Sequence, residues 1–136
     1  MLFKFLGKYR EFGLLILRVG LGVIFMIHGL PKLGAGPKLW HSLGDAMGNL
    51  GMHLFPTFWG FMAAIAEGVG GLLLILGAFY RPTALLLTFT MSIATLHLAL
   101  GAKTPPFSAY SYPLTMAFVF LGLAFIGPGR LSIDKD

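Results

Sequence analysis

Hydrophobic residues occur in four long stretches separated by shorter polar segments. The stretches cover residues 14–30, 58–78, 83–100 and 112–126. A helix rises about 1.5 Å per residue and a bilayer core is about 30 Å thick, so each stretch is long enough, or nearly so, to cross a membrane. The pattern predicts an all-α fold, a bundle of four transmembrane helices, in which residues 1–136 form a single membrane domain.

The connections between these stretches differ in pattern. After the first stretch, apolar residues recur at three- and four-residue spacing: Leu39, Leu43, Met47, Leu50 and Leu54. Polar residues occupy the opposite face, which predicts a short helix at the outer membrane interface. Glycines at 44, 48 and 51 disfavour a regular helix there. The connection 79–82 is short and predicts an antiparallel pair of helices.

Composition supports an integral membrane protein. Hydrophobic residues make up 57% of the chain and charged residues 11%, too few charges for the surface of one soluble domain. The chain has no cysteine, so acting alone it has no thiolate catalysis, disulfide exchange or iron–sulfur ligation.

The basic residues predict an orientation. In a four-span arrangement one side carries Lys4, Lys8, Arg10, Arg81, Arg130 and Lys135, and the other carries Lys32, Lys38 and Lys103. The excess predicts that both termini are cytoplasmic. The net charge of +5 is then explained by topology and contact with anionic membrane lipid, with no need for nucleic acid.

Four ionisable residues interrupt the apolar stretches: Arg18, His28, Glu67 and His97. A charge within hydrocarbon costs at least about 2.5 kcal/mol, so each needs a partner or a function. Helical periodicity places Glu67 on a face of small residues, turned toward another helix. From helical rise, Glu67 lies about one turn below two level histidines, and Arg18 reaches up toward it. The pattern predicts one polar cluster.

Several motifs together resemble a known family. They are Arg18-Val19-Gly20-Leu21-Gly22, His28-Gly29-Leu30-Pro31-Lys32-Leu33, Ala66-Glu67-Gly68-Val69-Gly70-Gly71, Gly127-Pro128-Gly129 and Leu131-Ser132-Ile133-Asp134. In order and spacing they resemble the DoxX family of small four-helix membrane proteins, over nearly the whole chain. The resemblance implies the bacterial inner membrane. It also implies subunits of thiosulfate or terminal quinol oxidoreductases, or of quinone-detoxification and oxidative-stress systems.

The residues and the resemblance together favour a quinone- or quinol-binding subunit of an oxidoreductase system. Quinol oxidation releases protons, so the site needs a base beside an apolar pocket. We expect Glu67 to accept the proton and Arg18 to hold it ionised. The other candidate quinone-binding residues are His28, His97, Lys32 and Trp59. The chain identifies no electron acceptor, which favours a partner subunit or a homodimer and leaves its own enzymatic role open.

Other interpretations stay open at this stage. The chain is alternatively a non-enzymatic membrane scaffold or small-solute carrier, in which Arg18 and Glu67 form a structural pair. His28 and His97 lie at the same predicted depth on two helices, which is compatible with a role as the two axial ligands of a haem b. A divalent metal held by these histidines and Glu67 lacks supporting spacing on any single helix, so no metal site is predicted.

Overall fold

Four long helices account for most of the chain in the computed structural model, which describes residues 2–101 and 105–134. They are α1 (Arg10–Ala35), α3 (Pro56–Leu76), α4 (Tyr80–Leu100) and α5 (Phe107–Ile126). All are long and apolar enough to cross a membrane, α1 together with the preceding 3-10 helix η1 (Lys4–Tyr9). The described residues contain no strand. The predicted all-α fold with four spans is confirmed.

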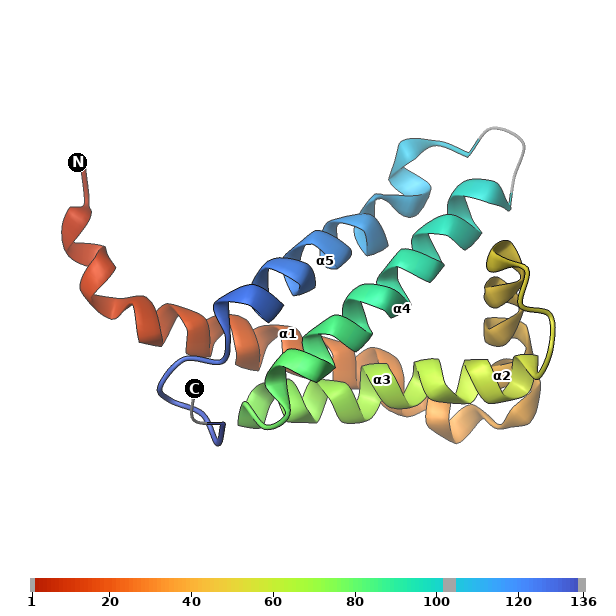
Figure 1. Cartoon of the computed structure of the whole chain (residues 1–136), viewed down its shortest axis with the longest axis horizontal. Coiled ribbons are helices and arrows are strands. Elements are labelled where there is room, and N and C mark those ends of the chain that lie inside the picture. The colour runs from red at the N-terminus through yellow and green to blue at the C-terminus, as the bar shows by residue number, and fades with distance from the viewer. Residues whose placement is uncertain (1, 102–104, 135–136) are drawn as a thin grey trace.

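The helices form two antiparallel pairs that diverge toward one end of the molecule (Figure 1). Helix α1 packs on α3, and α4 packs on α5. The pairs meet at the turn between α3 and α4, where Gly77 adopts φ 69°. Between the pairs, the Phe25 and Phe120 rings lie 5.0 Å apart in an edge-on contact. A core therefore forms near the turn, while the far ends are separated.

Glycines explain the close approach of α1 to α3. A Cβ at Gly22 would overlap the backbone carbonyl of Gly71, and a Cβ at Gly29 would overlap the backbone at Gly68. Small residues let membrane helices approach closely enough for extensive dispersion contact. Part of the face of small residues around Glu67 is therefore covered by α1. The periodicity predicted that another helix would approach this face.

The predicted short helix forms as two pieces across the divergent end. Helix α2 (Pro37–Gly44) runs into the 3-10 helix η2 (Asp45–Leu50). A Cβ at Gly44 would overlap the carbonyl of Pro56, and a Cβ at Gly60 would overlap that of Trp40. Glycine thus allows backbone-to-backbone contact between α2 and α3. We call α2 and η2 together the lid.

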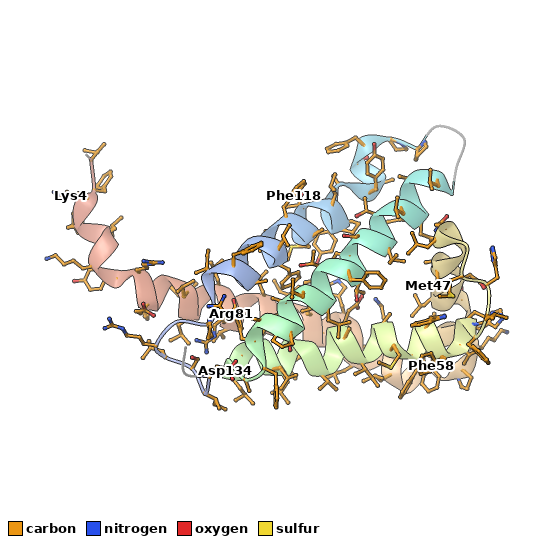
Figure 2. The ribbon with its side chains drawn as sticks, viewed as in Figure 1. Lys4, Met47, Phe58, Arg81, Phe118 and Asp134 are labelled. Carbon is orange, nitrogen blue, oxygen red and sulfur yellow. The ribbon has the colours of Figure 1, made fainter. Side chains whose placement is uncertain are left out.

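The C-terminal segment closes the opposite end of the bundle. Asp134 accepts hydrogen bonds from the backbone N–H of Phe79 (3.1 Å) and Tyr80 (2.8 Å), at the first turn of α4. Ile133 N–H donates to the Leu76 carbonyl, which pins the segment to the end of α3. Figure 2 shows Asp134 beside the turn between α3 and α4. We call residues 127–134 the tail strap.

The two chain termini therefore lie at the end of the molecule that carries the turn between α3 and α4 (Figure 1). The sequence predicted that both termini and the connection 79–82 lie on the same side of the four-span arrangement, and the structure has them at the same end. Lys103 and Lys135, which contributed to the predicted orientation, lie outside the described residues.

Candidate functional site

A cavity of about 420 Å³ lies between α3, α4 and the lid. Its walls are mainly apolar, with Met47 from the lid, Phe58 from α3 and Phe89 from α4. Figure 2 shows Met47 directed from η2 into the space between α3 and α4. The polar lining residues are Lys32, Ser42, Trp59, Glu67, Thr90 and His97. The cavity has the composition of a small-molecule site, an apolar chamber with a few polar groups.

The main polar feature of the cavity is an ion pair between α1 and α3. The Lys32 ammonium lies 2.6 Å from Oε2 of Glu67, with 29% and 8% of the two side chains exposed. Because α1 and α3 touch at Gly29, the last turn of α1 brings Lys32 over Glu67. Trp40 of the lid donates its indole N–H to the Lys32 carbonyl (2.8 Å). The pair is thus tied to the lid as well as to the bundle.

The predicted pairing of Arg18 with Glu67 is wrong. The Arg18 guanidinium donates to four backbone carbonyls: Leu74 (3.2 Å), Ile75 (2.9 Å), Pro128 (2.9 Å) and Leu131 (2.7 Å). The last carbonyls of a helix lack partners within it and carry partial negative charge, so the C-terminal end of α3 attracts the cation. Leu74 lies about 10 Å along α3 from Glu67. Arg18 extends toward the closed end, away from the cavity.

The two histidines do not share a site. His97 lines the cavity, and its Nδ1 lies 3.4 Å from the Asn49 amide nitrogen of the lid. His28 lies outside the cavity, with Nδ1 2.8 Å from the Ile24 carbonyl. The His28 ring stacks on Tyr112 with centroids 6.3 Å apart. Of the four residues expected to form one cluster, Glu67 and His97 line the cavity, whereas Arg18 and His28 do not.

The structure argues against the metal site and does not test the haem site. Among residues 2–101 and 105–134, no group of three His, Asp or Glu side chains is placed to hold a metal ion. The set of His28, Glu67 and His97 therefore does not assemble as a metal site. The haem b alternative stays a prediction, and the two histidines proposed as its ligands do not line a common cavity.

Hydrogen bonds show which cavity groups are available to a ligand. The Trp59 indole N–H already donates to the Leu54 carbonyl (3.0 Å), and the Thr90 hydroxyl donates to Leu86 (2.9 Å), so both serve mainly as wall. A lysine ammonium has three N–H donors, and a carboxylate has two acceptor oxygens. The Lys32–Glu67 pair therefore retains donors and acceptors that can face a ligand.

Part of the cavity was not predicted from the sequence. Ser42 and Met47 from the lid and Phe89 and Ile93 from α4 line it, although none was a candidate site residue. The signal for the lid residues was the amphipathic stripe that includes Leu43 and Met47, which predicted a short helix at the outer membrane interface. For α4, helical spacing aligned Ile93 with His97 but said nothing of the neighbouring helix.

Comparison with known proteins identifies the family. The DoxX family model matches residues 13–100, which include α1 from Gly13 onward, α2 to α4 and every residue lining the cavity. The "Inner membrane protein YphA" of Escherichia coli is 30% identical over 94% of this chain and 96% of its own length. The "Putative oxidoreductase CatD" of Bacillus subtilis is 29% identical over 95% and 90%. No solved structure matches the chain.

A second Escherichia coli relative supports the same assignment. The "Inner membrane protein YqjF" is 30% identical over 94% of this chain and 94% of its own length. The relatives thus match nearly the whole chain, beyond the segment covered by the family model. Together with the four apolar helices of spanning length, these matches show that the chain is a membrane protein that belongs to the DoxX family.

Proposed function

We propose that this protein is a membrane subunit of a quinone- or quinol-linked oxidoreductase system and binds the quinone ring in the cavity beside Lys32 and Glu67. The observation that carries the proposal is a charged pair at 2.6 Å facing a mainly apolar cavity of about 420 Å³. The name of the Bacillus subtilis relative, which describes it as an oxidoreductase, agrees with redox chemistry.

The proposed chemistry follows from proton balance. Oxidation of a quinol to a quinone releases two electrons and two protons, so the site needs bases within hydrogen-bond reach of the ring oxygens. Glu67 accepts one proton, and the Lys32 ammonium hydrogen-bonds the same end of the ring. His97, at the outer part of the cavity, accepts the second proton. The electrons pass to an acceptor carried by a partner subunit.

Lys32 takes the role that the sequence assigned to Arg18. The Lys32 ammonium is the cation that lies beside the Glu67 carboxylate, and the ionised carboxylate is the form that can act as a base. Arg18 lies at the closed end, bonded to backbone carbonyls, so we place it outside the reaction. Its contribution is to hold α1, the end of α3 and the tail strap together.

We further propose that the protein lies in the bacterial inner membrane with both termini in the cytoplasm. Two relatives are named as inner membrane proteins. The closed end carries Lys4, Lys8, Arg10, Arg81 and Arg130, and the positive-inside rule assigns such an end to the cytoplasm. The cavity and lid then lie toward the outer side of the membrane.

Equilibrium binding of a short-tailed benzoquinone to the purified protein tests the proposal. Quenching of tryptophan fluorescence reports on the cavity, because Trp59 lines it and the chain has only 2 tryptophans. Glu67→Gln keeps the side-chain shape but removes the charged acceptor. Since a hydrogen bond to a charged group is worth about 1.5–3 kcal/mol, we expect binding at least about tenfold weaker.

The matched control is Glu11→Gln, the same change at the closed end, where Glu11 accepts a hydrogen bond from the Arg130 N–H. This variant should bind the quinone as the unmodified protein does. Equal affinity of the Glu67 variant and the unmodified protein would reject Glu67 as the ring-binding base. Absence of quinone binding to the unmodified protein would favour the scaffold or carrier interpretation, with Lys32 in place of Arg18 in the structural pair.

A further inference from the structure

We propose that the cavity takes an amphiphile whose ring lies at Lys32 and Glu67 and whose aliphatic tail leaves between α3 and α4 into the lipid. The inference rests on the proposed function and adds a substrate class, a long-tailed membrane lipid, and a route. Its physical basis is the size of the cavity, the depth of its polar end and the chemistry of its exposed edge.

Size excludes complete enclosure of a long tail. The cavity volume of about 420 Å³ lies near the low end of the range of about 300–1,000 Å³ found for sites that bury drug-sized ligands. A ring and the first part of a chain fill such a space. The remainder of a long tail must leave through an opening.

The depth of Glu67 in the membrane determines which part of the bilayer a tail enters when it leaves the cavity. Glu67 is near the middle of α3 (Pro56–Leu76), about 15 Å from either end by helical rise. A tail that leaves sideways at this level enters the hydrocarbon core. Its methylene groups then stay out of water, which favours the bound state.

The exposed edge of the cavity is apolar where it faces lipid. Some side chains both line the cavity and are exposed on the outside of the molecule, so they form its rim: Phe58, Met62, Leu86, Phe89 and Leu98. They belong to α3 and α4, the helices that diverge from the closed end (Figure 1). The polar lining residues Ser42 and His97 lie toward the lid. An aliphatic tail is therefore compatible with the rim.

Two neighbouring leucines on α4 provide a matched test of the rim. Leu86 lines the cavity and is 43% exposed, whereas Leu85 is 52% exposed and lies outside it. A tryptophan at position 86 narrows the opening, and one at position 85 adds the same bulk on the lipid-facing surface. Both variants experience the same concentration of a lipid-soluble probe in the membrane.

The experiment uses two photoreactive probes with the same azidobenzoquinone ring, one with a ten-carbon chain and one with a methyl group. The protein in lipid nanodiscs is illuminated with each probe, and labelled cavity peptides are quantified by mass spectrometry. We expect Leu86→Trp to lower labelling by the long-tailed probe about tenfold. A factor of this size corresponds to the loss of apolar contact for about two methylene groups of the tail. Leu85→Trp should label as the unmodified protein does, and the methyl probe should label all three proteins alike.

The outcomes separate this inference from the proposed function. If the methyl probe labels the cavity but Leu86→Trp and Leu85→Trp respond alike to the long-tailed probe, the tail route is wrong and the ring site stands. Equal loss of both probes in Leu86→Trp also overturns the route, because the ring itself is then displaced. If neither probe labels the cavity of the unmodified protein, both proposals fail.

A second pair of variants on α3 guards against misfolding of the first pair. Met62→Trp changes a rim residue, and Leu72→Trp changes an exposed residue outside the cavity on the same helix. The same selective loss of the long-tailed probe is expected for Met62→Trp alone. Equal responses of these two variants to that probe would overturn the route.

Discussion

The two ends of the bundle each hold a charge within a membrane-spanning helix, but in different ways. At the closed end, Arg18 is 2% exposed and its four hydrogen bonds all go to backbone carbonyls. In the cavity between the diverging helices, Glu67 has one cationic partner, Lys32. A satisfied buried cation fixes structure, whereas a charge pair beside an open chamber remains available to a ligand. The partners of an intramembrane charge, more than its presence, indicate its role.

Arg18→Ala should give the largest loss of stability. The change removes the side-chain donor from the carbonyls of Ile75, Pro128 and Leu131, and each buried group left unsatisfied costs about 1–3 kcal/mol. We expect a loss of about 3 kcal/mol or more, measured by reversible unfolding in detergent. Arg10→Ala is the control, because Arg10 is exposed at the start of α1 and should change stability by less than about 0.5 kcal/mol. Similar stability of both variants would remove the distinction between the two ends.

Gly60→Ala should disturb the divergent end through the lid. The added methyl group overlaps the Trp40 carbonyl, so α2 has to move, at a cost of about 1–3 kcal/mol. Quinone binding should weaken as well, because the Trp40 indole is bonded to the Lys32 carbonyl. Gly122→Ala is the control, since no atom lies within 4 Å of its added Cβ. Helix propensity makes that change neutral or stabilising by up to about 1 kcal/mol. Unaltered quinone binding in Gly60→Ala would show that the lid does not shape the site.

Asp134→Ala should have the smallest effect of the three. The change removes acceptors for two N–H groups at the first turn of α4, a capping interaction worth about 1 kcal/mol. Ring binding should be unchanged, because the tail strap lies at the closed end. Asp45→Ala in the exposed part of the lid should cost less than about 0.5 kcal/mol. A strong loss of quinone affinity in Asp134→Ala, with the protein still folded, would argue that the two ends are coupled.

The fold was predictable because it depends on properties that individual stretches of sequence contain. Apolar length identified the four spans, and the stripe that includes Leu43 and Met47 identified the lid. The spacing of small residues identified a face of α3 that another helix approaches closely. These signals depend on residue type and on the period of the pattern. Both can be read from one stretch of sequence without knowing which helix packs against it.

The site was predicted only in part because helical periodicity gives a face and not a partner. Arg18 and Lys32 lie on the same face of α1, about 21 Å apart along the axis. Whether a long side chain extends up or down that axis depends on its nearest acceptors. For Arg18 these are backbone carbonyls, which any residue supplies and which leave no mark in the sequence. Lys32 was predicted only as a ring-binding residue, and its pairing with Glu67 required the structure.

Native mass spectrometry of the protein purified in mild detergent tests the central claim most directly. It compares the unmodified protein with Glu67→Gln, at the cavity, and Asp134→Ala, at the closed end. The account predicts a retained mass that corresponds to a quinone on the unmodified protein and on Asp134→Ala, and its loss from Glu67→Gln. The same quinone retained by all three proteins, or a bare chain in each case, would contradict the assignment of function to the Lys32–Glu67 cavity.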